Sequence, residues 1–302
     1  MFRTAGWLAA RLPGPTGRAL AESAAMVVAN SGTLGTLRRR KLVASHLRRV
    51  YTSSPGRAQI EGAALRRAVD DTFASYARYW AESLRLPSVR PVELSAGMSS
   101  DGFEHLFRAW AGGRGVILAL PHLGGWEWGG AWLASQGVPV SVVVEALEPA
   151  ELFDWFVGFR RTLGFEVIAA GAEAGSAALR ALHAGRVLAL LCDRVVGGGP
   201  GVDVELFGDQ TVLPAGPVTL AFRTGAPLLP AAVYFAPGRP DHLAVVRPPL
   251  ALERGGRFRA DVQRGTQVLA GELETLIRRA PTQWHLMQPN WPGDPGWRQG
   301  ST

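Results

Sequence analysis

The sequence contains a single cysteine, Cys192, among its 302 residues. A disulfide within the chain is therefore excluded, which is typical of a protein in a reducing compartment. One cysteine and six scattered histidines give no spacing that would hold a zinc ion, so we predict no metal. The G-x-S-x-G motif of serine hydrolases is also absent. A zinc enzyme and a hydrolase with a serine nucleophile are both disfavoured.

Long uncharged hydrophobic runs are missing as well. Charges and the residues Pro13 and Pro15 interrupt the first thirty residues, and the most apolar stretch, residues 116–134, includes His122 and Glu127. Crossing a bilayer as a helix takes about 20 apolar residues. We therefore expect neither a transmembrane helix nor a signal peptide. The hydrophobic share of 47% is nevertheless enough for a globular core.

Most of the chain has no excess of positive over negative residues; the excess lies in its first 67 residues. Residues 1–67 hold 12 Arg and Lys against Glu22 and Glu61, a balance of +10, whereas the rest holds 20 against 23. A basic end of this kind predicts an anionic partner. Residues 33–51 combine leucines with a basic cluster, which is typical of membrane-surface helices and equally of soluble helices with a solvated basic face. Nucleic acid is disfavoured because the segment is poor in aromatic residues for base stacking.

Short apolar runs alternate with helical periodicity from residue 115 onward. This alternation predicts an α/β fold with a central mixed sheet flanked by helices. We expect one domain over 1–302, in which 1–56 form basic N-terminal helices and 57–302 form the α/β body. The predicted helices of the body cover residues 58–86, 101–111, 125–135, 149–163, 176–184 and 260–280. The predicted strands cover residues 116–120, 138–144, 166–169, 187–192, 202–207, 227–235 and 242–246.

The segment 120–127, Leu-Pro-His-Leu-Gly-Gly-Trp-Glu, carries the strongest signal for chemistry. His122 comes just after the first buried strand, where α/β folds bind ligands. Imidazole accepts a proton near neutral pH, and a positioned base contributes about 10²–10⁴-fold to a rate. We expect the next helix to begin near Gly124 or Gly125, so that its first unpaired N–H groups bind negative charge on a reacting carbonyl. Glu127 would orient the imidazole or cap this helix; a lone histidine is otherwise most often structural.

An ordered set of motifs resembles the lipid A lauroyl/myristoyl acyltransferase family, and within it the actinobacterial phosphatidylinositol mannoside acyltransferases. The resemblance covers about residues 35–291 and includes the H-x₄-D/E signature from His122 to Glu127. The chain has Gly125 where the family usually has asparagine. The other matching segments are Tyr76–Glu82, Gly102–Leu106, Asp193-Arg194, Gly201–Asp209, Leu213–Pro217, Thr224–Pro227 and Trp284–Gln288.

The resemblance implies a role for several side chains. It makes His122 the general base and points to Asp203, in the Gly-Val-Asp-Val stretch, as its carboxylate partner, with Glu127 as the rival. It places Arg160 and Arg194 where they would bind donor phosphates or steady site carboxylates. Two weaker binding candidates are Asp209 and Glu145. Among Trp126, Trp128 and Trp132, which would stack on a sugar or line an acyl groove, at least two are expected to pack in the core.

The resemblance also implies a fold similar to glycerolipid acyltransferases and a peripheral location at the cytoplasmic face of the cell membrane. The donor would be a long-chain acyl-CoA, with palmitoyl favoured. The acceptor would be a mannose hydroxyl of a phosphatidylinositol mannoside, and no cofactor is needed. Two alternatives stay open. One is transfer from acyl carrier protein to another glycolipid or lysophospholipid, and the other is a non-catalytic relative that binds membranes.

Overall fold

The computed structural model describes residues 34–53, 56, 59–145, 150–196, 199–238 and 241–297. The helices expected within residues 1–30 lie outside these ranges. The helices are α3 (Leu34–Thr52), α4 (Gly62–Arg85), α5 (Pro91–Ala96), α6 (Phe103–Ala111), α7 (Trp126–Ser135), α8 (Ala150–Thr162), α9 (Ala174–His183), α10 (Gly216–Thr224) and α11 (Phe258–Arg279), with short 3₁₀ turns η1 (Leu86–Ser88) and η2 (Pro281–Gln283). The strands are β1 (Met98–Asp101), β2 (Val116–Leu120), β3 (Val140–Val144), β4 (Glu166–Ala169), β5 (Val187–Leu191), β6 (Gly201–Leu206), β7 (Asp209–Pro214), β8 (Leu228–Phe235) and β9 (His242–Val246).

Seven strands form one central sheet in the order β1-β9-β8-β2-β5-β3-β4. All neighbouring pairs are parallel except β8 with β9, which is antiparallel. The predicted α/β fold with a mixed central sheet flanked by helices is therefore confirmed. The remaining strands of the described ranges, β6 and β7, form a separate antiparallel hairpin.

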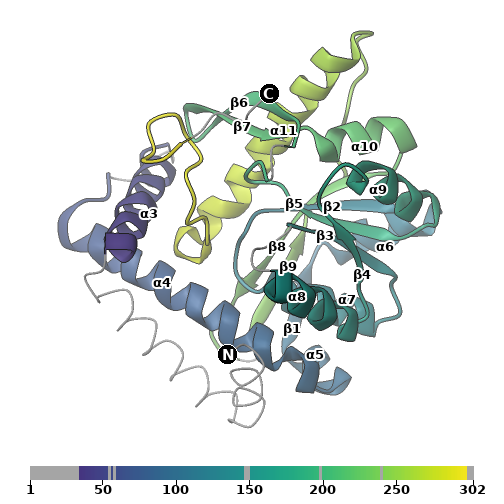
Figure 1. Ribbon diagram of the computed structural model, residues 1–302, viewed down its shortest axis with the longest axis horizontal. Coiled ribbons are helices and arrows are strands. Elements are labelled where there is room, and N and C mark those ends of the chain that lie inside the picture. Colours follow the sequence, from purple (N-terminus) through teal and green to yellow (C-terminus); the bar gives the residue numbers. More distant parts are fainter. Residues whose placement is uncertain are drawn as a thin grey trace.

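Helices cover both faces of this sheet, as Figure 1 shows. The five residues of β2 are all buried, and they divide between two hydrophobic cores. Ile117 and Ala119 pack with α9, α10 and α11, whereas Leu118 and Leu120 pack with α6, α7 and α8 on the opposite face. A strand buried on both faces needs an uninterrupted apolar sequence, which is why this run was recognisable.

Helix α3 begins and ends within one residue of its predicted range, but the apolar residues of its second half do not face outward. Leu42, Leu47 and Val50 are buried, and Leu47 packs with residues of α4. These residues therefore contact the protein itself, which favours the second interpretation of this segment, a helix with a solvated basic face. The exposed part of the helix carries positive charge, including Arg39 and Lys41. In the part of the chain that is described, no helix has the length and hydropathy needed to cross a bilayer.

Four elements were not predicted: β1, α5, β7 and α10. β7 is polar along much of its length, and it is a strand because it pairs with β6 through a two-residue turn. Phe207 and Gly208 in that turn both have positive φ, 57° and 83°. This backbone conformation belongs to the tight turns that match the twist of a hairpin. A phenylalanine is rare there, so composition gave no turn signal at this position.

Candidate active site

Two neighbouring parallel strands bring a histidine and an aspartate together at one edge of the sheet. β2 and β5 are paired so that Leu120 lies opposite Leu191. The backbone N–H of Cys192 donates to the carbonyl of Leu120, at 2.8 Å, which extends this register. His122 comes two residues after Leu120, and Asp193 comes two residues after Leu191. Both therefore lie at the carboxyl edge, where α/β sheets bind ligands.

Asp193 holds His122 through two hydrogen bonds, one to the imidazole and one to the backbone N–H. His122 Nδ1 lies 2.6 Å from Oδ1 of Asp193, and the backbone N–H of His122 donates to Oδ2 at 2.9 Å. A carboxylate accepts only, so in the neutral imidazole Nδ1 carries the proton and Nε2 carries the lone pair. Among the described residues, Nε2 has no hydrogen-bond partner, and the side chain is 17% exposed. This is the tautomer of a general base oriented by an acid, in the geometry of the catalytic triad without its serine.

The carboxylate of Asp193 is completely buried, and further donors surround it. The indole N–H of Trp284 donates to Oδ2 at 2.7 Å, and the side-chain amide of Asn290 donates to the backbone carbonyl of Asp193 at 3.0 Å. Burial by itself raises the pKa of the Asp193 carboxyl. The facing His122 and the hydrogen bonds from His122 and Trp284 outweigh burial and hold this pKa below its ordinary value. Asp193 is therefore an anion that can stabilise an imidazolium.

The prediction that Asp203 contacts His122 is wrong. Asp203 lies on β6, where apolar and acidic residues alternate. Since successive side chains of a strand point to opposite faces, burial of Val204 and Leu206 turns Asp203 and Glu205 to solvent. At the surface, the side-chain amide of Gln263 on α11 donates to the backbone carbonyl of Asp203 at 3.4 Å.

Glu127, the rival partner, is also engaged elsewhere. It lies in the first turn of α7, is 3% exposed, and accepts hydrogen bonds from Arg160 of α8 and, at 3.4 Å, from Tyr79 of α4. Burial alone lowers the pKa of Arg160, but the facing carboxylate raises it above the ordinary value. This buried ion pair holds α8 against α7, so the H-x₄-E spacing does not make a histidine–carboxylate pair here.

The other predicted binding residues are found in ion pairs. Arg194 Nη2 donates to Glu145 Oε2 at 2.8 Å, and these two residues follow the neighbouring strands β5 and β3 at the same sheet edge as His122. Nε of Arg194 is buried and has no partner among the described residues. Asp209 pairs with Arg49 of α3 at 2.7 Å and belongs to the β6–β7 hairpin. Arg194 thus holds the carboxylate of Glu145, and Arg49 holds the carboxylate of Asp209.

The N–H groups of the two glycines after His122 are already bonded within the protein and do not bind an anion. Helix α7 begins at Trp126, and the N–H groups of Gly124 and Gly125 donate to the carbonyls of Gln283 and Val233, each at 2.9 Å. A Cβ on Gly125 would lie 2.9 Å from the ring of His242, which needs this space. The tight packing explains why glycine replaces the asparagine expected at this position.

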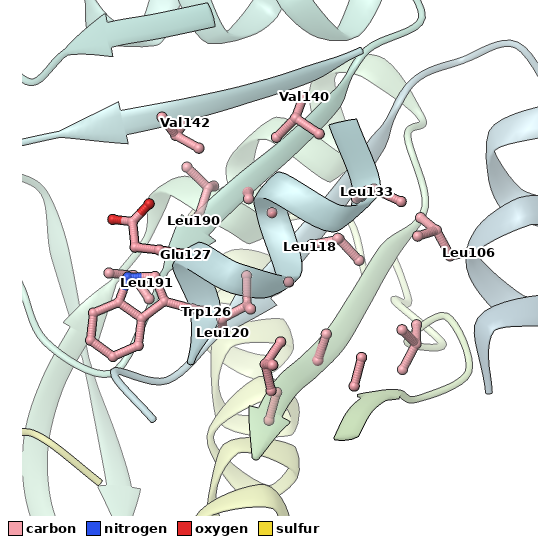
Figure 2. A pocket seen from close by; sticks show the side chains of 18 of the residues that line it. Leu106, Leu118, Leu120, Trp126, Glu127, Leu133, Val140, Val142, Leu190 and Leu191 are labelled. Carbon is pink, nitrogen blue, oxygen red and sulfur yellow. The ribbon is translucent and has the colours of Figure 1, made fainter. Parts of the chain in front are cut away.

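An apolar cavity extends from the site beneath α7. It encloses about 830 Å³, including space open to solvent. Figure 2 shows Trp126 and Glu127 at one end of this helix and Leu133 at its other end, with Leu106 beyond it. Trp126 lines the cavity and also lies edge-on to the ring of His122, with the ring centroids 5.7 Å apart. The cavity and the imidazole therefore share one wall.

Comparison with known proteins decides the family. A model of the bacterial lipid A biosynthesis acyltransferases matches residues 61–292. The chain belongs to this family. It is 38% identical over 227 residues to a phosphatidylinositol mannoside acyltransferase of Mycolicibacterium smegmatis, which covers 74% of this chain and 72% of the relative. A phosphatidylinositol mannoside acyltransferase of Mycobacterium tuberculosis H37Rv is 37% identical over 228 residues, 74% of this chain and 70% of the relative.

This acyltransferase therefore has a site that sequence reasoning located only in part. His122 was singled out, but Asp193 was quoted only as part of a motif, and Trp284 and Asn290 received no role. A signal was available for Asp193, because it follows a predicted strand just as His122 does. No comparable signal exists for Trp284, which reaches Asp193 from 91 residues away. No group of three or more His, Cys, Asp or Glu side chains in the described ranges is arranged to hold a metal.

Proposed function

We propose that this protein transfers a long-chain acyl group, with palmitoyl favoured, from acyl-CoA to a mannose hydroxyl of a phosphatidylinositol mannoside. The observation that carries the proposal is an imidazole with a free Nε2, oriented by a buried aspartate, at the wall of an apolar cavity. The relatives' activity gives the acceptor class. Direct transfer from donor to acceptor suits the site because its base needs no serine or cysteine nucleophile.

His122 is the general base in this proposal. A sugar hydroxyl becomes a strong nucleophile only when its proton is removed, and Nε2 is the atom placed to accept it. The resulting imidazolium faces the carboxylate of Asp193, which stabilises the new charge at short range. The same imidazolium then donates its proton to the departing thiolate.

The cavity beneath α7 receives the acyl chain. Apart from Trp126, Glu127 and Arg160, its described lining consists of apolar side chains and glycine. Glu127 and Arg160 neutralise each other, so a hydrocarbon meets no unpaired charge. Gly129 and Gly130 let α7 approach its neighbours closely, because a Cβ on either would come within 2.7 Å of Val233 or Phe165.

Arg194 is our choice for binding the donor's phosphates. It lies at the same sheet edge as His122, and its guanidinium keeps a buried N–H at Nε without a partner among the described residues. Binding a phosphate through planar, charge-assisted hydrogen bonds is a common role of arginine. Glu145 would then hold Arg194 in position.

The test is acyl transfer by the purified protein, with palmitoyl-CoA and palmitoyl-acyl carrier protein offered separately alongside mannoside acceptors. We expect transfer from palmitoyl-CoA, and a loss of at least about 10²-fold in His122→Ala with folding retained. His183→Ala, an exposed histidine on α9, is the matched control and should keep full activity. A preference for the carrier-protein donor would reassign the donor. Absence of acceptor-dependent thioester cleavage in the wild-type protein would support a non-catalytic relative.

We further propose that the basic face of α3 brings the protein to the cytoplasmic face of the cell membrane. Arg39, Lys41 and Arg48 are exposed on this helix. A basic residue near an anionic surface contributes about 1 kcal/mol, so replacing all three by glutamine should weaken binding to phosphatidylinositol-containing vesicles about 100-fold at low salt. Unchanged vesicle binding would exclude this face as the contact.

A further inference from the structure

The indole N–H of Trp126 is an unused hydrogen-bond donor inside the site. Its Nε1 is buried and has no partner among the described residues, although Trp126 lines the apolar cavity. A buried donor without an acceptor costs about 1–3 kcal/mol, so such a group calls for a reason. Figure 2 draws the indole nitrogen on the side of the ring where Glu127 and Leu191 lie, and both of those residues line the cavity.

Neighbouring side chains hold the Trp126 ring in place. Tyr79 stacks on it, with the ring centroids 4.0 Å apart and the planes 27° apart. The ring of His122 meets it edge to face, at 5.7 Å. A ring packed between these partners cannot turn its N–H out to solvent without breaking both contacts. The donor is therefore preorganised beside the base.

Several other donors near His122 already have acceptors. The N–H groups of Gly124 and Gly125 are bonded to backbone carbonyls, and the guanidinium of Arg160 is bonded to Glu127. The developing charge of acyl transfer needs a donor that becomes better paired in the transition state than it was before. Among the described polar side chains that line the cavity, those of Trp126, Glu127 and Arg160, the indole N–H of Trp126 meets this condition.

We propose that Trp126 is a catalytic residue whose N–H binds the thioester carbonyl oxygen. This inference rests on the proposed function, because it needs a thioester in the cavity. The acceptor hydroxyl oxygen attacks the carbonyl carbon while its proton passes to Nε2 of His122. The carbonyl π pair moves to oxygen, and the resulting oxyanion accepts the indole N–H. When the C=O bond reforms, the C–S bond breaks, and the thiolate takes the proton from the imidazolium.

Trp126→Phe tests this role because it keeps an aromatic ring for Tyr79 and removes only the donor end. Losing one oxyanion donor should lower kcat about 10²–10³-fold, with KM changed less than about 3-fold. Trp128→Phe is the matched control: Trp128 is on the same helix and also has a buried Nε1 without a partner in the described ranges, but it stacks on His242 and does not line the cavity. We expect Trp128→Phe to keep kcat within about 2-fold of wild type.

Benzothienylalanine at position 126 keeps the shape of the indole and replaces N–H by sulfur, so it serves if Trp126→Phe does not fold. The infrared band of the bound palmitoyl-CoA carbonyl gives a readout that needs no acceptor. This band should lie lower in the wild type than in the Trp126 variant. A carbonyl shift without transfer to mannosides would remove the proposed acceptor and leave the inference standing. Equal kcat values for the Trp126 and Trp128 variants, or an unshifted band, would overturn the inference, whatever His122→Ala shows.

Discussion

Replacing Asp193 by asparagine should nearly abolish acyl transfer while leaving the shape of the site intact. The carboxylate accepts three hydrogen bonds, from Nδ1 and the backbone N–H of His122 and from the indole of Trp284. Asparagine has one acceptor oxygen and one amide. If the oxygen keeps the two donors now on Oδ2, the amide faces Nδ1 and donates to it. The proton of the imidazole then moves to Nε2, which can no longer accept a proton from an alcohol.

The expected loss follows from this change of tautomer and from the missing negative charge. In a serine protease the same substitution lowers kcat about 10⁴-fold, and we expect about 10³–10⁴-fold here, equivalent to about 4–5 kcal/mol in the activation free energy. Asp203→Asn is the matched control, because it makes the same chemical change at an exposed site on β6. That variant should keep its rate within about 2-fold of wild type.

The assay is single-turnover transfer from radiolabelled palmitoyl-CoA to a mannoside acceptor, with circular dichroism of each variant as the check on folding. Restored activity in an Asp193→Glu variant would show that the negative charge matters more than its exact distance. A larger loss for Asp203→Asn than for Asp193→Asn would refute the pairing seen in the structure and return Asp203 to the role that its motif suggested.

Two further predictions concern buried charges. Glu127→Gln leaves the guanidinium of Arg160 buried without its counter-ion, so the free energy of unfolding should fall by about 3 kcal/mol in chemical denaturation. The double variant Glu127→Gln, Arg160→Met should recover part of this stability. A loss of kcat at unchanged stability would instead place Glu127 in catalysis. Burial lowers the pKa of His285 to about 3, so the folded protein keeps this ring neutral while the unfolded chain takes up a proton below about pH 6.5. The contribution of the neutral His285 ring to the stability of the fold is complete above about pH 6.5 and is lost as the pH falls below it. Between pH 7 and pH 5 the free energy of unfolding of the wild type should fall by about 2 kcal/mol more than that of His285→Gln. Glutamine is chosen because its amide can still reach the hydroxyl of Ser75. Equal losses would mean that His285 is not the group being titrated.

Most of the secondary structure was predictable because burial on both faces leaves a clear pattern. The apolar run of β2 and the helix, strand, helix and strand that follow it appear in the sequence as alternating periods, and their bounds agree with the structure within a few residues. The polar strand β7 left no such pattern, because it exists only through pairing with β6. Position just after a buried strand was likewise enough to locate His122.

The sequence by itself determined the family, the α/β alternation and the histidine that we propose as the base. Only the tertiary structure decided which acid faces that base, because the choice depends on strand register and not on spacing along the chain. The pairing of β2 with β5 brings Asp193 to His122. The alternation of side chains along β6 turns Asp203 to solvent, and the packing of α8 against α7 pairs Glu127 with Arg160. Which carboxylate faces the histidine depends on which one the fold buries within hydrogen-bond distance of the ring, and that is a property of the packed chain.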